Sequence, residues 1–222
     1  MHNRQCAAQS CTSKAVGYSN LCSSHRNTKV RHGHHLQAAI PATRLAPYLH
    51  RVQARQKANG NSEAWSILAR RWALLVDDSK RALGVYQAGA ISVRHQVQSA
   101  EQVRNLDGLG DPMAVVNVTL AMHLLYIAEP RAFLSDLAFD HQLVRRVRSL
   151  VPMNVGSYWC PKEKRTKRVY RDLPPRVVAI LAGQLKSAFG GAGYQLADIE
   201  ARTVDPREVE RQRLAEALEA LQ

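Results

Sequence analysis

DPMAVVNVTLAMHLLYIA, residues 111–128, is the most apolar stretch of this 222-residue chain and decides its architecture. Asp111 is a favoured helix N-cap residue, and Pro112 suits the first helical position, where its missing N–H would have no intrahelical partner. Large apolar side chains then occupy nearly every face of the predicted helix, and Glu129 and Pro130 end it. A helix of this kind needs neighbours on all sides, so we expect it to lie at the centre of a helical core.

The segments on either side of this stretch show helical periodicity. Apolar residues recur at three- and four-residue spacing in segments 43–57, 62–86, 93–105 (more weakly) and 135–150. Ser62 and Ser135 are N-cap residue types at two of these starts, and Gly84 and Gly89 are candidate breaks in the longest helix. We therefore predict a mostly α fold.

The pattern changes after residue 152. Residues 155–160 and 167–171 resemble two strands joined by a charged tip, which predicts a β-hairpin over about 155–171. Ten consecutive residues of this hairpin, 162–171, include six basic ones: Lys162, Lys164, Arg165, Lys167, Arg168 and Arg171. A basic hairpin that follows a pair of helices resembles the order of elements in a winged-helix domain, whose wing contacts the nucleic-acid backbone or minor groove.

The C-terminal region is predicted to hold two more helices. The first opens at Asp172-Leu-Pro-Pro, and Gly190 and Gly191 end it, so that Gly190–Gly193 forms a C-cap and a linker. The last helix starts at Asp205-Pro206 in a capping-box-like pattern. Its narrow apolar stripe, which we interpret as a docking face for a protein partner, consists of Leu214, Leu218 and Leu221.

The first 35 residues contain too few large apolar side chains to form a hydrophobic core. The spacing Cys6-x4-Cys11-x10-Cys22-x2-His25 offers two close pairs of thiol and imidazole ligands, as tetrahedral zinc requires. With four protein ligands no position is left for water, so we expect one structural zinc ion that supplies folding free energy. A disulfide among the three cysteines would leave one thiol over. His32 is an alternative fourth ligand, and Cys160 is predicted to be an ordinary thiol outside this set.

The same region resembles a known family. Tyr18-Ser-Asn-Leu-Cys22-Ser-Ser-His25-Arg26, followed by Arg31-His32-Gly33, is similar to the small Cys3His zinc-finger modules of bacterial and phage proteins, which often accompany HNH endonucleases or other DNA-directed domains. The resemblance covers residues 4–35. It departs where Arg26 replaces the usual aromatic residue and where the tail from Lys29 to Gly33 lacks the usual tryptophan. It implies zinc ligation and a DNA-directed role.

The charge is distributed unevenly along the chain. The formal net charge is +13, and residues 1–62 hold nine Lys and Arg but no acidic residue. An acid-free basic segment favours a polyanionic partner, with nucleic acid ahead of an anionic membrane surface. We predict contacts with nucleic acid from Lys14, Arg26, Lys29, Arg31 and His32 in the finger and from Lys162, Lys164, Arg165, Lys167 and Arg168 in the hairpin.

No catalytic motif is recognisable in the sequence, which lacks a phosphate-binding glycine loop, a His-Glu-x-x-His pair and a recognisable His-Asn-His arrangement. Loose acid–base candidates without partners at useful spacing are Asp77, Asp78, His123, Asp136, Asp140 and His141. We therefore expect a protein that is not an enzyme, and no catalytic residues. The N-terminus carries no apolar leader, and the longest apolar run is too short for a bilayer, so we expect a cytoplasmic protein without a membrane partner.

These patterns predict a zinc finger with a basic tail at 1–38, a helical domain with the hairpin at 42–192, and a linker with a C-terminal helix at 193–222. The predicted function is that of a zinc-dependent DNA-binding accessory protein or transcription regulator of a bacterium, phage or mobile element. Three alternatives stay open: an adaptor that docks on a polymerase or recombinase, a nuclease that is HNH-associated or of another kind, and RNA as the ligand in place of DNA. The oligomeric state is left open.

Overall fold

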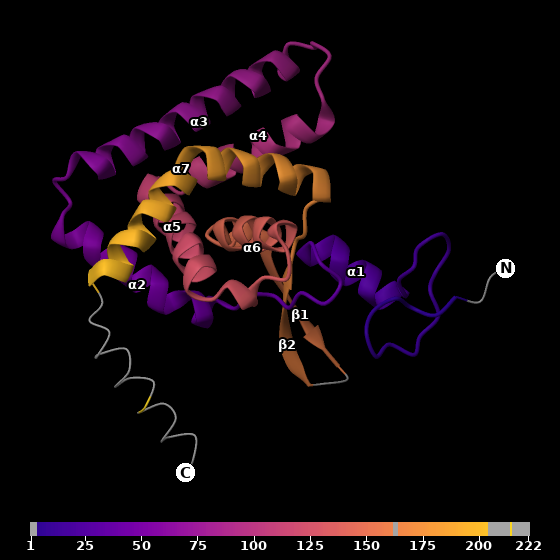
Figure 1. Cartoon of the computed structure of the whole chain (residues 1–222). Helices are drawn as coiled ribbons and strands as arrows, with labels where there is room; N and C mark the ends of the chain where they lie inside the picture. The colour runs from indigo at the N-terminus through magenta and orange to yellow at the C-terminus, as the bar shows by residue number, and fades with distance from the viewer. Residues whose placement is uncertain (1–3, 162–163, 204–213, 215–222) are drawn as a thin grey trace.

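The fold was analysed in a computed structural model, which describes residues 4–161, 164–203 and 214. In chain order the helices are α1 (Ser23–His32), α2 (Ala42–Ala58), α3 (Glu63–Gln87), α4 (Arg94–Asp107), α5 (Pro112–Ala128), α6 (Asp136–Arg148) and α7 (Pro175–Thr203). A two-stranded sheet, β1 (Val155–Cys160) and β2 (Arg165–Tyr170), lies between α6 and α7. The prediction of a mostly helical chain is confirmed (Figure 1).

Helix α5 lies at the centre of the body, as its composition predicts. Every residue from Val115 to Leu125 is buried, and the helix packs against α2, α3, α6 and α7 (Figure 1). Its start is stabilised by the Asp111 side chain, which accepts hydrogen bonds from the backbone N–H groups of Met113 and Ala114. The apolar residues of this helix and of the helices around it form one continuous core.

Helix α7 corrects the prediction for the C-terminal region. It runs without interruption from Pro175 to Thr203, so the predicted end at Gly190 and Gly191 is wrong, and residues 193–203 are helical and not a linker. The glycine at position 193 serves the packing of α7 and does not end the helix. A Cβ atom at Gly193 would lie 2.6 Å from the Cβ atom of His123 in α5. Glycine is therefore required here for the approach of two helices. The amphipathic helix predicted from residue 205 lies outside the described residues, except for the exposed Leu214.

The long helix α3 also passes through its first candidate break. It continues past Gly84 to Gln87, and the chain turns at Gly89, whose φ of +84° favours glycine. Ser62 caps the start of this helix by accepting a hydrogen bond from the backbone N–H of Ala64, and Ser135 caps α6 in the same way from Ala138.

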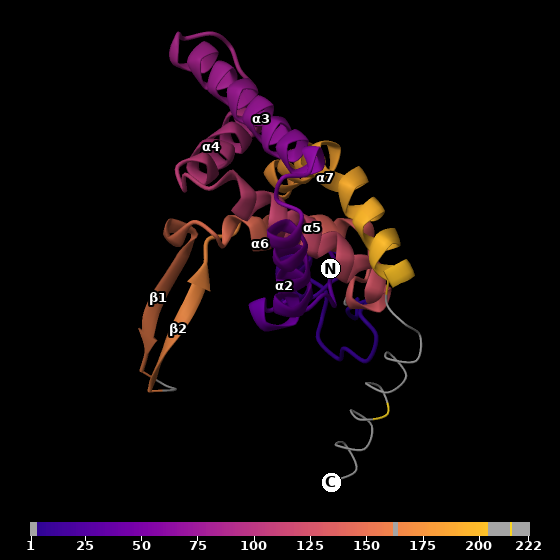
Figure 2. The same ribbon diagram turned by 90° about the vertical axis from the view of Figure 1, so that its left-hand side faces the viewer.

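The predicted hairpin is present. Strands β1 and β2 pair antiparallel, with Val155 opposite Tyr170 and Cys160 opposite Arg165. Figure 2 shows the hairpin projecting from the body as an isolated arm. Within the described residues, no single helix is both long and apolar enough to cross a bilayer, although α4 and α5 taken together, bent by 113°, reach that length and composition.

Candidate metal centre and basic surfaces

The backbone of the finger brings its two ligand pairs together. Residues 4–7 and 13–16 run antiparallel, joined by hydrogen bonds from the N–H of Cys6 to the carbonyl of Ser13 (2.9 Å) and from the N–H of Ala15 to the carbonyl of Arg4 (2.9 Å). The chain then reverses at Gly17, whose φ is +59°. Cys22 is the N-cap residue of α1, which places His25 in the first turn of that helix. The second ligand pair is therefore held by a helix start.

The four predicted ligands converge. The Nδ1 atom of His25 lies 3.5 Å from Sγ of Cys6 and 3.3 Å from Sγ of Cys22, and the Sγ atoms of Cys11 and Cys22 are 4.0 Å apart. All four ligand atoms lie within 4.8 Å of one another. Tetrahedral zinc with ordinary bond lengths separates two sulfurs by about 3.8 Å and a sulfur from a nitrogen by about 3.6 Å. The cluster therefore fits a tetrahedral ion of this size.

The electrostatics of the thiols also favour a cation. Burial raises the pKa of the Cys6 thiol, but backbone N–H groups of Ala8 and Cys22 and the side chain of His25 outweigh this and lower it to about 6. At Cys22 the backbone N–H of His25 favours the thiolate, yet burial and the neighbouring sulfurs of Cys6 and Cys11 raise its pKa. The Cys6 thiolate thus forms readily, while the neighbouring sulfurs disfavour ionisation of Cys22. A bound cation would offset this repulsion and favour the ionised form of the thiols.

His32 does not belong to this ligand set. It lies at the opposite end of α1, where its Nδ1 atom is 3.1 Å from Nε2 of Gln142 in α6. The Gln142 amide is oriented by the N–H of Ile40, which donates to its Oε1 atom at 2.9 Å. His32 therefore accepts a hydrogen bond and helps to dock the finger, and this half-buried ring faces α6.

The contact between α1 and α6, here called the seam, is close and polar. Nδ1 of His141 lies 3.2 Å from the carbonyl oxygen of Arg31, and Gly33 ends α1 with a φ of +80°. A Cβ atom at Gly33 would lie 2.4 Å from the carbonyl oxygen of Leu137, so no other residue fits there without displacing α6. The next turn of chain is anchored as well, because buried Gln37 bonds to the backbone of Ala132 and Leu134. The finger is thus firmly attached to the body.

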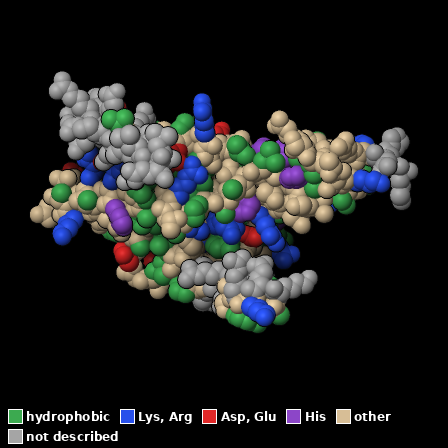
Figure 3. Space-filling model, turned by 90° about the horizontal axis from the view of Figure 1, so that it is seen from below, with side chains coloured by type: hydrophobic (Ala, Val, Ile, Leu, Met, Phe, Trp, Pro, Cys, Tyr) green, Lys and Arg blue, Asp and Glu red, His purple; other side chains and the backbone are tan. Residues whose placement is uncertain are grey.

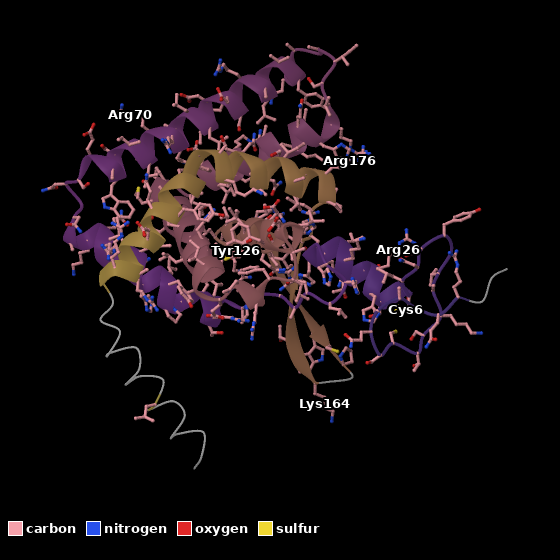
Figure 4. The ribbon with its side chains drawn as sticks, in the orientation of Figure 1. Cys6, Arg26, Arg70, Tyr126, Lys164 and Arg176 are labelled. Carbon is pink, nitrogen blue, oxygen red and sulfur yellow. The ribbon has the colours of Figure 1, made fainter. Side chains whose placement is uncertain are left out.

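The finger presents several cations to solvent. Lys14, Arg26 and Lys29 are exposed, and in the described part of the chain none of them forms an ion pair. Figure 4 places Arg26 and Cys6 on the finger and Lys164 at the tip of the hairpin. Figure 3, a view from below, shows Lys and Arg side chains spread across one face with few acidic ones.

Several basic residues of the acid-free N-terminal segment are paired by acids from distant parts of the chain. Arg44 of α2 bonds to Glu129, and Arg55 bonds to Glu200 of α7. Arg31 lies 3.4 Å from Asp172, although its side chain remains 62% exposed. Charge counted along the sequence therefore overstates the free positive charge of α2.

The hairpin residues predicted to contact nucleic acid are described in part. Lys164 is exposed at the turn, with a φ of +47°. Lys162 lies outside the described residues, and of Arg165, Lys167 and Arg168 only the backbone within β2 is described.

Sequence reasoning missed the cluster at the base of the hairpin. Arg148 of α6 is 2% exposed and donates to the side chains of Gln102 and Asn154 and to the carbonyl of Arg171. Arg145, one turn earlier, bonds to Asp172 at 2.8 Å. The signal was present, because Arg148 falls on the same helical stripe as the buried Val144, where a solvated arginine is not expected.

The loose acid–base candidates are scattered. Asp78 pairs with Arg81 on the surface of α3, Asp140 pairs with Lys186, and Asp136 accepts a hydrogen bond from the Tyr126 hydroxyl. His123 is buried in α5, with Nδ1 2.9 Å from the carbonyl of Thr119. Among the residues that the structure describes, the Cys3His cluster is the one group of three or more such side chains close enough to share an ion.

Comparison with protein-family models, with curated proteins and with solved structures gave no match for this chain. The resemblance of residues 4–35 to Cys3His fingers therefore rests on those residues and on the geometry of the four ligands.

Proposed function

We propose that this protein is a zinc-dependent nucleic-acid-binding protein with duplex DNA as its ligand, acting as an accessory or regulatory factor of a bacterium, phage or mobile element. The observation that carries the proposal is the finger: Lys14, Arg26 and Lys29 are exposed on a small unit that contains no acidic residue. Such groups attract phosphates and fix position on a duplex.

The metal of the proposed finger is a structural zinc ion. The ligands are three thiols and one imidazole, which zinc prefers, and all four coordination positions are filled by protein. The ion would hold Cys6 and Cys11 against the start of α1, and thereby present Arg26 and Lys29 from that helix. Its role is in folding and not in catalysis, which agrees with a protein that is not an enzyme.

The hairpin is proposed as a second contact, in the manner of a wing. It projects from the same body to which α1 is docked, and Lys164 is exposed at its tip (Figure 2). Two basic contacts on one scaffold would bind separate phosphates along the ligand.

A second candidate function is a protein-interaction adaptor. The turn between α3 and α4 exposes four large apolar side chains, with Ile91 fully exposed; the set is Val85, Tyr86, Ile91 and Val93. Apolar groups gathered at an exposed turn are typical of a protein contact. Binding to a polymerase or recombinase without affinity for nucleic acid would favour this function.

The test is a fluorescence-anisotropy titration with a duplex DNA, a single-stranded DNA and an RNA of equal length at several salt concentrations. We expect the duplex to bind most tightly and its affinity to fall steeply with salt, because phosphate contacts release counterions. Arg26→Gln and Lys164→Gln should each lower the slope of log affinity against log salt concentration by about one, because each removes one phosphate contact. Arg202→Gln, at the far end of α7, is the matched control. Weak, salt-independent binding would contradict the proposal, tighter RNA binding would replace DNA as the ligand, and divalent-dependent cleavage of DNA would favour a nuclease.

A further inference from the structure

We propose that the seam contains a phosphate-binding site, a small hollow lined by residues from the end of α1, from α6 and from the chain entering α7. Its lining includes Arg31, Arg145, Arg148, Tyr170 and Asp172. The ligand is one phosphate group of the nucleic-acid backbone, so the inference rests on the proposed function and adds a third contact between finger and hairpin.

The charges lining the hollow do not balance. Three guanidinium groups face one carboxylate, that of Asp172. Burial lowers the pKa of His141, which keeps this imidazole neutral at pH 7, and burial raises the pKa of the Tyr170 phenol, which therefore supplies no negative charge. The lining carries a net charge of about +2, since three arginines and one carboxylate are its charged groups. An anion is the ligand that this imbalance favours.

The burial of Arg148 strengthens this argument. Within the described part of the chain, its guanidinium donates hydrogen bonds to neutral groups only. These are the Tyr170 hydroxyl (3.1 Å), the side chains of Gln102 and Asn154 and the carbonyl of Arg171. Burial lowers the pKa of Arg148. A cation removed from water and solvated by neutral dipoles alone gains from a nearby negative charge. The charge of Arg148 thus makes the electrostatic potential in the hollow more positive, while its N–H donors hold the base of the hairpin in place.

Arg31 and Arg145 are the groups placed to touch the phosphate. Asp172 engages one nitrogen of each, Nη1 of Arg145 at 2.8 Å and Nε of Arg31 at 3.4 Å. A guanidinium carries five N–H donors, so each arginine keeps donors for an oxyanion. The Arg145 guanidinium also lies over the Tyr170 ring, 4.2 Å from its centroid, which orients its donors before the ligand arrives.

The site also lies where the finger, the body and the chain that leaves the hairpin come together. Arg31 belongs to the finger helix, Arg145 to the body, and Asp172 to the chain that leaves β2 and enters α7. A phosphate bound between the two arginines would join finger and body as Asp172 does now. Asp172 is then a positioning residue that holds both arginines in the free protein and competes with the phosphate for them.

The experiment measures the affinity of the full-length, zinc-loaded protein for the duplex described above. Arg31→Gln and Arg145→Gln are each compared with Arg202→Gln, which removes one positive charge about seven turns along α7 from Val178, the α7 residue that lines the hollow. We expect each seam variant to lose about tenfold in affinity and about one unit of salt slope, and the control to change little. Zinc content and circular dichroism check that each variant is folded. If Arg145→Gln is unstable, Arg31→Gln still tests the site, because Arg31 is exposed and its replacement leaves the core intact.

The opposite charge change supplies the second arm. Asp172→Asn frees both arginines and should raise affinity several-fold more than Asp198→Asn, which removes an equivalent carboxylate from the partner of Arg202. Inorganic phosphate at millimolar concentration should weaken duplex binding to the wild type more than to Arg31→Gln, which distinguishes a phosphate site from general electrostatic attraction.

The outcomes separate the two proposals. If the wild type binds the duplex while the seam variants behave as their controls at residues 198 and 202 do, the phosphate site is overturned and the proposed function stands. If the wild type binds no nucleic acid at low salt, the proposed function fails, and the phosphate site fails with it unless phosphate alone raises the melting temperature of the wild type and not of Arg31→Gln.

Discussion

At the scale of single residues, the packing of Gly193 on His123 shows how a residue that breaks helices in isolation can be required inside one. A methyl group at Gly193 would overlap the imidazole, whereas one at Gly191, two residues earlier on the exposed side of α7, would meet nothing within 4 Å. Glycine costs helix stability at both positions. Only at Gly193 does the packing of α5 on α7 offset that cost.

The two positions therefore predict opposite effects of alanine. Gly193→Ala should destabilise the protein by about 1–3 kcal/mol through overpacking. Gly191→Ala should stabilise it by about 0.5–1 kcal/mol through helix propensity. Urea unfolding followed by circular dichroism measures both. Equal effects at the two positions would show that α7 does not approach His123 as described.

The metal ligands give a second prediction at this scale. Cys22→Ser should abolish the binding of about one zinc ion per chain, because it removes one of the three thiols of the proposed ligand set. Cys160→Ser, outside the ligand set, should retain full zinc content. Elemental analysis of the two purified variants provides the measurement, and zinc at the wild-type level in Cys22→Ser would exclude the proposed ligand set.

At the scale of elements, the docking of α1 on α6 depends on a neutral histidine. His32 must accept a hydrogen bond from Gln142, and burial, followed by the charge of Arg145, lowers its pKa below the ordinary value of 6.5. A group whose pKa is lowered by folding binds more protons in the unfolded state, so its contribution to stability is present above pH 6.5 and decreases as the pH falls below it.

Acidification from pH 7.5 to 5.5 should therefore weaken the attachment of the finger. The protection factors of the α1 amides, which correct the observed exchange rates for the intrinsic pH dependence of amide exchange, should fall at the lower pH. His32→Gln should reduce that fall because its amide does not titrate. His95, half-exposed on α4, supplies the control variant His95→Gln. An identical pH response in His32→Gln and the wild type would contradict this role of His32.

At the scale of the whole molecule, the finger and the body have separate cores. Cys6, Ala8, Leu21 and Cys22 form a small cluster that does not join the large core built around α5. We therefore expect the body to hold its fold without the metal. The finger has only this small cluster and its contacts with α6 and the chain before α6 to stabilise it, so we expect it to depend on the metal.

Chelation of zinc should accordingly unfold the finger and leave the body folded. We expect a small loss of helical circular dichroism, matching the ten residues of α1, and about a tenfold or larger loss of affinity for duplex DNA. The melting transition of the body should persist. A single cooperative loss of all helicity on chelation would show instead that the finger is integral to the body.

The elements that could be predicted are those with strong local signals. Asp111, Ser62 and Ser135 mark helix starts that the structure confirms, and the hairpin lies where its alternation and charged tip place it. Helix α1 was not predicted as a helix, because it has no apolar stripe and buries no residue. It begins after Cys22 of the Cys3His cluster and ends at Gly33, which closely approaches α6.

The sequence by itself determined the central helix, the helical character of its neighbours and the four side chains of the Cys3His cluster, because capping, periodicity and the spacing of thiols and imidazole act over a few residues. Tertiary structure alone decided the continuation of α7 past Gly190, the pairing of Arg31, Arg44 and Arg55 with distant acids, and the arginine-lined hollow at the seam. These depend on groups more than 60 residues apart in the chain, whose proximity follows from how the whole core packs.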